Sequence, residues 1–118
     1  MSEFNDYAEK LAKARENLQN ALKKKGEEVI EAISKWNARS ITLGNWKIKK
    51  TPDGIYMKYK DHYVVSCYDD SFVSTDTLIE AAKDFRKNFI KAFKDFCESR
   101  SKELEKLNRE IEELTVTP

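Results

Sequence analysis

Hydrophobic and polar positions follow a helical period in the first third of the chain. Apolar or small side chains recur about every 3.6 residues, at Phe4, Tyr7, Leu11, Ala14, Leu18, Leu22, Val29, Ile33 and Trp36. We expect one long helix, capped by Ser2 or Asn5 and ended by Asn37, which tolerates the left-handed conformation. Gly26 lies inside this run, and we interpret it as a tolerated glycine or a kink, not a chain break.

The last third of the chain repeats the same period and predicts a second long helix. Thr77, followed three residues later by Glu80, has the pattern of a capping box at its start. The stripe is aromatic near its beginning and aliphatic near its end. It comprises Leu78, Ala82, Phe85, Phe89, Phe93, Phe96, Arg100, Leu104, Leu107, Ile111 and Leu114.

Between the helices the apolar period changes to two, which is typical of half-buried strands. Three short strands are expected over 46–49, 55–60 and 63–68, and the segment 41–43 can add a short strand before them. Thr51-Pro52-Asp53-Gly54 is a strong turn signal between the first two of the three strands.

The alternation also predicts the pairing register. A four-residue loop at 51–54 brings Trp46 and Ile48 to the same face as Met57 and Tyr59, whereas a slip by one residue would bury lysines. A three-residue loop at 60–62, with His62 in the left-handed region, adds three more side chains to this inner face: Tyr63, Val65 and Cys67. The outer face then carries Lys47, Lys49, Tyr56, Lys58, Val64, Ser66 and Tyr68.

These elements predict an α+β fold in one domain over residues 1–118. The second helix begins at the sheet where the first one ends, so we expect an antiparallel helical hairpin with both termini at its far end. Its core is expected at Trp46, Phe85, Phe89 and Phe93. This layout of two long helices joined by β structure resembles, in topology and length, the β-type prefoldin subunit.

The helices are too long for the sheet to cover. A helix of this length extends about 50 Å, whereas a six-residue strand extends only about 20 Å. The uncovered stripe predicts a homo-oligomer, most simply a homodimer that forms a four-helix arrangement. Its interface residues would be Phe4, Tyr7, Leu11, Leu104, Leu107, Ile111 and Leu114. The alternative is a monomer in which a kink at Gly26 folds the helices over the sheet.

Composition excludes several classes of protein. The 118 residues include 22 basic and 21 acidic side chains, and the net charge of +1 argues against a strongly basic nucleic-acid protein or an acidic mimic. Only three glycines and two prolines are present, so a turn-rich sandwich, a barrel, a Rossmann domain or a glycine-rich phosphate loop is not expected.

Isolated cysteines and a polar N-terminus indicate the compartment. Cys67 and Cys97 read as reduced, half-buried thiols, with a single disulfide as the alternative. The first seven residues do not resemble a signal peptide, and no apolar run approaches the length of a membrane span. We therefore expect a cytoplasmic protein without membrane association.

Candidate chemistry is sparse, and we expect no catalytic residue, metal or cofactor. The single histidine, His62, follows Asp61 in an expected turn, and no nucleophile–base pair can be assigned. The acidic segment 68–71, together with Asp76, has oxygen ligands for a divalent cation, but its spacing fits no calcium loop. We interpret it as a solvated loop whose charges favour the N-terminus of the second helix.

Two basic features remain. Lys47, Lys49 and Lys58, and by extension Lys60, are interleaved with Tyr56 and Tyr68 on the outer sheet face, and the second helix carries another group: Lys83, Arg86, Lys87, Lys91 and Lys94. Lysines with exposed aromatic rings are typical of single-stranded nucleic-acid binding. Because net charge is nearly zero, we favour a role in solubility and in blocking edge pairing, with an acidic protein partner as another alternative.

The sequence thus predicts a non-enzymatic protein-interaction module that binds another macromolecule as a homo-oligomer. Small adaptors, inhibitors and accessory factors, which are frequent in phages and mobile elements, have this character. Alternatives are a nucleic-acid-binding module that uses the lysine–tyrosine face, a chaperone-like holder that uses the helix tips, and a small-ligand binder with its site between subunits.

Overall fold

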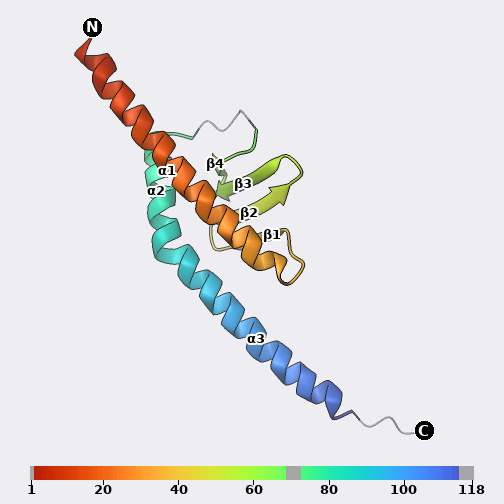
Figure 1. Ribbon diagram of the computed structural model, residues 1–118. Helices are drawn as coiled ribbons and strands as arrows, with labels where there is room; N and C mark the ends of the chain where they lie inside the picture. The colour runs from red at the N-terminus through yellow and green to blue at the C-terminus, as the bar shows by residue number, and fades with distance from the viewer. Residues whose placement is uncertain (1, 69–72, 115–118) are drawn as a thin grey trace.

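Two long helical segments lie on one face of a four-stranded antiparallel sheet in the computed structural model, which describes residues 2–68 and 73–114 (Figure 1). The predicted α+β class is confirmed, and the segment near 41–43 forms a strand of its own. The elements are α1 (Glu3–Ser34), β1 (Ser40–Leu43), β2 (Trp46–Thr51), β3 (Gly54–Tyr59), β4 (His62–Val65), α2 (Thr75–Asp84), the π-helical turn η1 (Phe85–Phe89) and α3 (Ile90–Glu112).

Helix α1 begins and ends near the residues that the sequence indicated. The Ser2 hydroxyl accepts a hydrogen bond from the Phe4 N–H at 3.1 Å, and Asn37 adopts a φ of 63° just after the helix. The helix runs through Gly26 without interruption, so the expected alternative of a kink that folds the helices over the sheet is wrong.

Gly26 has a packing role instead. It is buried where α1 crosses β3, and a β-carbon at this position would lie 2.6 Å from Met57 Sδ and 3.1 Å from Ile55 Cδ1. Both distances are shorter than van der Waals contact. The absence of a side chain therefore lets the helix approach the sheet closely enough to bury both strand residues.

The register between β2 and β3 follows the burial argument. Trp46 pairs with Tyr59 and Ile48 with Met57, and all four side chains lie on the buried face. The strand order is β1-β2-β3-β4, so the sheet is a simple meander.

The register between β3 and β4 differs from the prediction. Tyr59 pairs with His62 across a two-residue turn in which Lys60, not His62, has the positive φ of 53°. Tyr63 then pairs with Lys58 and lies on the exposed outer face, and a bulge follows that brings Val65 opposite Met57.

Burial of two consecutive valines explains this change. Strict alternation would expose one of them, whereas the irregularity in the ladder lets both Val64 and Val65 be buried. The expected inner position of Tyr63 and the expected outer position of Val64 are therefore wrong. Cys67 lies beyond β4, where its half-buried Sγ is 3.6 Å from Thr51 Oγ1.

The two helical segments run parallel to each other, so the expected antiparallel hairpin is also wrong. Arg15 in α1 donates a hydrogen bond to Thr75 Oγ1 at 2.7 Å, at the start of α2, and Trp36 beyond the end of α1 stacks on Phe93 in α3. The termini consequently lie at opposite ends of a molecule 86 Å long (Figure 1).

The width of the sheet, and not the length of its strands, explains why the second helical segment runs parallel to α1. Each added strand moves the chain about 4.8 Å back along α1. Ala38, just before β1, donates its N–H to the Ile33 carbonyl, whereas the Val64 carbonyl in β4 accepts a hydrogen bond from Gln19. The chain therefore leaves the sheet beside the middle of α1, and Arg15 holds the Val73 carbonyl there at 2.8 Å.

A π-helical turn shapes the second helical segment. Helix α2 is capped by Ser74, which accepts the Thr77 N–H, so the expected capping box at Thr77 is not formed. The π-helical turn follows α2, and the direction of the helix changes there (Figure 1). Within it, Phe85 and Phe89, four residues apart, stack with ring centroids at 4.8 Å.

The predicted core at the junction of sheet and helix is confirmed for Trp46, Phe85 and Phe89, whereas Phe93 is only half-buried and packs against the edge of the core. Trp46 is only 1 % exposed, its ring lies 5.2 Å from those of both Tyr59 and Phe85, and its indole N–H donates to Asp84 Oδ2 at 2.9 Å. Phe89 completes the cluster at 6.4 Å from Trp46. This aromatic cluster thus helps to attach the sheet to the second helical segment.

A polar contact closes the same junction at the surface. Glu80 in α2 accepts hydrogen bonds from Lys60 Nζ at 3.1 Å and from the Tyr59 hydroxyl at 3.2 Å. The hydrogen bond from Lys60, and then that from Tyr59, lowers the pKa of Glu80 below its ordinary value. Burial, followed by the bond to Glu80, raises the pKa of Tyr59.

Candidate interaction surfaces

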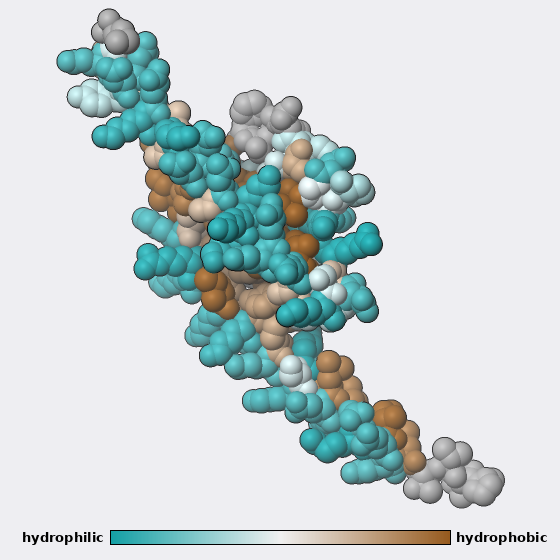
Figure 2. Space-filling model, viewed as in Figure 1, coloured by the Kyte–Doolittle hydropathy of each residue, from teal (hydrophilic) through white to brown (hydrophobic). Residues whose placement is uncertain are grey.

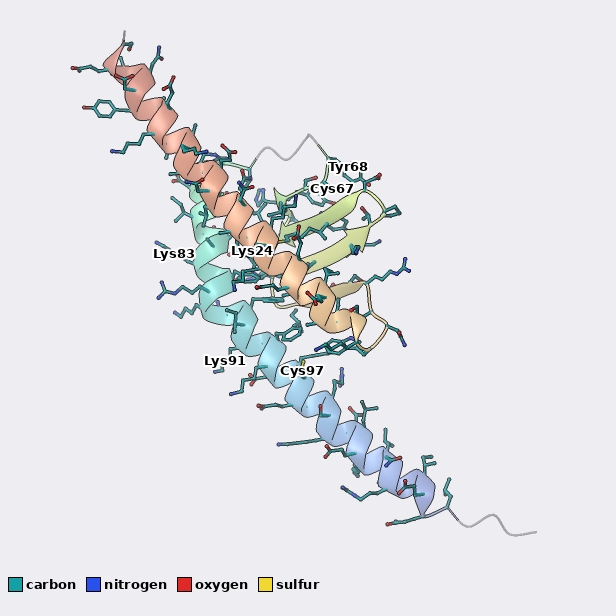
Figure 3. The ribbon with its side chains drawn as sticks, in the orientation of Figure 1. Lys24, Cys67, Tyr68, Lys83, Lys91 and Cys97 are labelled. Atoms are coloured by element: carbon teal, nitrogen blue, oxygen red, sulfur yellow. The ribbon has the colours of Figure 1, made fainter. Side chains whose placement is uncertain are left out.

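The residues considered for catalysis or metal binding are not brought together in the described part of the chain. His62 is exposed at its turn, and residues 2–68 and 73–114 contain no group of three or more potential metal-ligating side chains. Cys67 and Cys97 are both free and half-buried and lie far apart (Figure 3). Asp69, Asp70 and Ser71 lie outside the described residues. None of the described helices is long and apolar enough to cross a membrane.

Exposed apolar side chains lie along the two free helix ends. Helix α1 extends beyond the sheet before Arg15, and α3 extends beyond Trp36 in the opposite direction (Figure 1). Apolar side chains gather along the free end of α3 in Figure 2. The exposed residues are Phe4, Tyr7 and Leu11 in the N-terminal end and Leu104, Leu107, Ile111 and Leu114 in the C-terminal end.

These are the residues that the sequence assigned to an oligomer interface. Each of them is exposed, from 46 % at Leu107 to 84 % at Phe4. Because the helices are parallel, however, the structure separates them into two surfaces at opposite ends of the molecule. We call them the N-terminal stripe and the C-terminal stripe.

The spacing within both stripes is that of a coiled coil. Phe4, Tyr7, Leu11 and Ala14 follow one another by three, four and three residues. The same three steps separate the members of the C-terminal stripe: Leu104, Leu107, Ile111 and Leu114. Alternating steps of three and four keep an apolar seam toward a partner helix. In an isolated helix, such a seam would leave its apolar side chains exposed to water.

The outer face of the sheet is the second candidate surface. The helices pack on the opposite face, so its side chains point to solvent (Figure 1). The structure places Lys47, Lys49, Tyr56 and Lys58 there as expected, with Tyr68 near the β2–β3 turn, where its hydroxyl lies 3.3 Å from Asp53 Oδ2.

Tyr63 belongs to this face although the sequence reasoning placed it inside. Its ring lies 5.5 Å from that of Tyr56 in an edge-to-face contact, and Lys58 Nζ lies 5.5 Å from the Tyr63 centroid. Tyr56, Tyr63, Ser66 and Tyr68 line a shallow hollow of about 210 Å³. The signal that could have found Tyr63 is Lys60-Asp61, which forms a two-residue turn and moves Tyr63 to the other face of the sheet.

The basic residues of the second helical segment form a different surface. Lys83, Arg86, Lys87, Lys91 and Lys94 are all exposed. Figure 3 shows Lys83 and Lys91 on the side of the helices that points away from the sheet. The two basic groups of the sequence therefore cannot bind one small ligand together.

An apolar seam that the sequence did not indicate joins α1 to α3. Trp36 contacts the rings of Phe93 and Phe96 at 6.2 and 6.5 Å, and Arg100 covers the Phe96 ring at 5.2 Å. Ile90, next to this seam, is 57 % exposed. The seam leads from the core toward the C-terminal stripe.

Comparison with known proteins gives no functional information for these surfaces: no family model, no curated protein and no solved structure matches the chain.

Proposed function

We propose that the protein is a non-enzymatic interaction module, of the adaptor, inhibitor or accessory type, that works as a homo-oligomer assembled through its two apolar stripes. The single observation that carries the proposal is the coiled-coil spacing of side chains left exposed at both ends of the molecule. Contiguous apolar surface of this kind on a soluble protein marks an interaction site.

The parallel direction of the helices suggests how the stripes of two copies pair in a dimer. A two-fold axis perpendicular to the long axis of the molecule places the N-terminal stripe of one copy beside the C-terminal stripe of the other, in antiparallel orientation. Phe4 then lies level with Leu114 of the partner copy, and Leu11 level with Leu107 of the partner copy. The two copies lie side by side over their whole length, and the contact occurs twice.

Charges that flank the stripes favour this pairing over the homotypic ones. Lys10 directly precedes the seam residue Leu11, and Glu110 directly precedes the seam residue Ile111. Both therefore occupy the same flanking position of the seam. In an antiparallel pair of helices, the residues at this position face each other. Pairing unlike stripes brings Lys10 opposite Glu110. Two antiparallel N-terminal stripes would bring Lys10 opposite itself, and two C-terminal stripes would do the same with Glu110, which costs stability.

We expect the wild-type chain to sediment as a dimer or larger at micromolar concentration. Leu107→Glu or Ile111→Glu places a charge in the seam and should shift the solution mass to that of a monomer, because a buried unpaired carboxylate is strongly unfavourable. Lys102→Gln, which changes the charge equally on the polar side of α3, should leave the mass unchanged. A wild-type monomer with the same mass in every variant would contradict self-association.

Charge reversal tests the pairing itself. Lys10→Glu should weaken the dimer by creating a repulsion with Glu110, and Glu110→Lys should weaken it equally. Combining the two should restore the wild-type dissociation constant, as measured by sedimentation at low ionic strength. If neither single substitution changes assembly, like stripes meet instead, because each substitution then exchanges one like-charge pair for another. No rescue in the double variant would likewise contradict the unlike pairing.

A further inference from the structure

We propose that the outer face of the sheet binds single-stranded nucleic acid, with Lys47, Lys49 and Lys58 on the phosphates and the exposed tyrosines under the bases. This inference goes beyond self-association and does not depend on it. The register of the sheet places like charges together on this face.

The cross-strand pairs leave a local excess of positive charge. Lys47 in β2 is the direct partner of Lys58 in β3, and Lys49 lies in the next row of the same face. Like charges directly opposite each other destabilise a sheet. The four strands contain no aspartate or glutamate, and none of these three lysines forms an ion pair with a described residue. A bound anion would remove the repulsion.

The aromatic residues specify what kind of anion fits. Tyr63 and Tyr68 are about half exposed, and with Tyr56 they line the hollow beside the lysines. In the row that crosses from β2 to β4, the order is Lys47, Lys58, Tyr63, and in the adjacent row Lys49 pairs with Tyr56. Each row therefore offers positive charge on one side and a ring on the other.

This arrangement matches the repeat of a single strand, in which charged phosphates alternate with planar bases that stack on aromatic side chains. Base pairs in a duplex are already stacked and cannot reach the tyrosine rings. An acidic peptide would satisfy the lysines but would leave the rings without partners. The near-zero net charge of the chain does not oppose binding, because the acidic residues lie outside the strands of this face.

Fluorescence anisotropy with a short labelled oligothymidylate tests the proposal. We expect micromolar affinity for the wild-type chain, with a logarithmic salt slope of about −0.7 per phosphate contacted. The combined variant Lys47→Glu, Lys49→Glu, Lys58→Glu should abolish binding and retain the wild-type circular dichroism spectrum, because these side chains point away from the core. Tyr63→Ala should weaken binding about 5- to 150-fold if a base stacks on its ring.

A matched triple variant on the helices separates this face from the other basic surface. Lys83→Glu, Lys87→Glu, Lys91→Glu changes the net charge by the same amount and should leave affinity within about twofold. Loss of binding only in the helix variant, or wild-type affinity in the sheet variant, would overturn the proposal. So would an equal affinity for an oligoglutamate peptide, or no binding at physiological ionic strength. The titration is repeated with Leu107→Glu, the variant expected to be monomeric. This variant should bind the oligonucleotide with wild-type affinity, because Leu107 is not part of the outer face of the sheet.

Discussion

Replacing Trp46 with alanine is expected to lower the free energy of unfolding by about 3–5 kcal/mol. The indole is 1 % exposed and lies between β3 and the second helical segment, with aromatic neighbours on both sides. Truncation removes these contacts, leaves a cavity, and deprives Asp84 Oδ2 of the indole N–H that it accepts at 2.9 Å. Urea unfolding followed by circular dichroism at fixed protein concentration measures the loss.

Trp36 is the matched control for this substitution. It is also a tryptophan in an aromatic cluster, but it is 46 % exposed, so Trp36→Ala should cost only about 1 kcal/mol. Trp46→Phe should fall between the two variants, since it keeps most of the packing and loses the hydrogen bond. Equal unfolding midpoints for the two alanine variants would show that Trp46 is not the centre of the core.

The features that sequence analysis predicted correctly are local. The change of apolar period from 3.6 to two separates helices from strands, because each period reflects how one backbone geometry presents its side chains. The pairing of Ile48 with Met57 follows because a one-residue slip would exchange apolar side chains for lysines. Asn37 ends α1 because few other residues adopt a positive φ so readily.

The features that sequence analysis missed depend on competing interactions in the folded chain, which periodicity does not reveal. Strict alternation could not anticipate the bulge in β4, where burying both Val64 and Val65 outweighs a regular ladder. The direction of α2 depends on contacts made only in the folded chain, above all those of Arg15 with Val73 and Thr75. Composition contains no signal for a bond between residues so distant in sequence.

The candidate surfaces show the same division. Lys47, Lys49, Tyr56 and Lys58 share a face because alternation in one hairpin places them there. Tyr63 joined them only through the turn at Lys60, whose backbone conformation no periodicity reveals. The apolar stripes were found from their spacing, but their separation to opposite ends followed from the direction of the helices. The single long interface expected from the sequence is therefore two separate stripes, and a second copy of the chain can contact both of them.

Gly26→Leu is expected to destabilise the fold by about 3 kcal/mol or more, even though leucine favours helix much more than glycine does. The gain in helix propensity is about 1 kcal/mol at most. Opposing it, even a β-carbon would lie 2.6 Å from Met57 Sδ, and the Met57 side chain is fully buried and has no solvent to move into. Four added carbon atoms must therefore push α1 away from β3.

Two further variants attribute this loss to close packing and not to the glycine itself. Lys24→Leu adds a leucine to an exposed position of the same helix and should change stability by about 0.5 kcal/mol or less. In a double-mutant cycle, Gly26→Ala combined with Met57→Ala should be more stable than the two single effects predict, by about 0.5–3 kcal/mol, because the new methyl group enters space that the methionine has left. If Gly26→Leu unfolds at the same urea concentration as Lys24→Leu, the helix does not approach the sheet this closely. An additive cycle would locate the strain at a contact other than Met57.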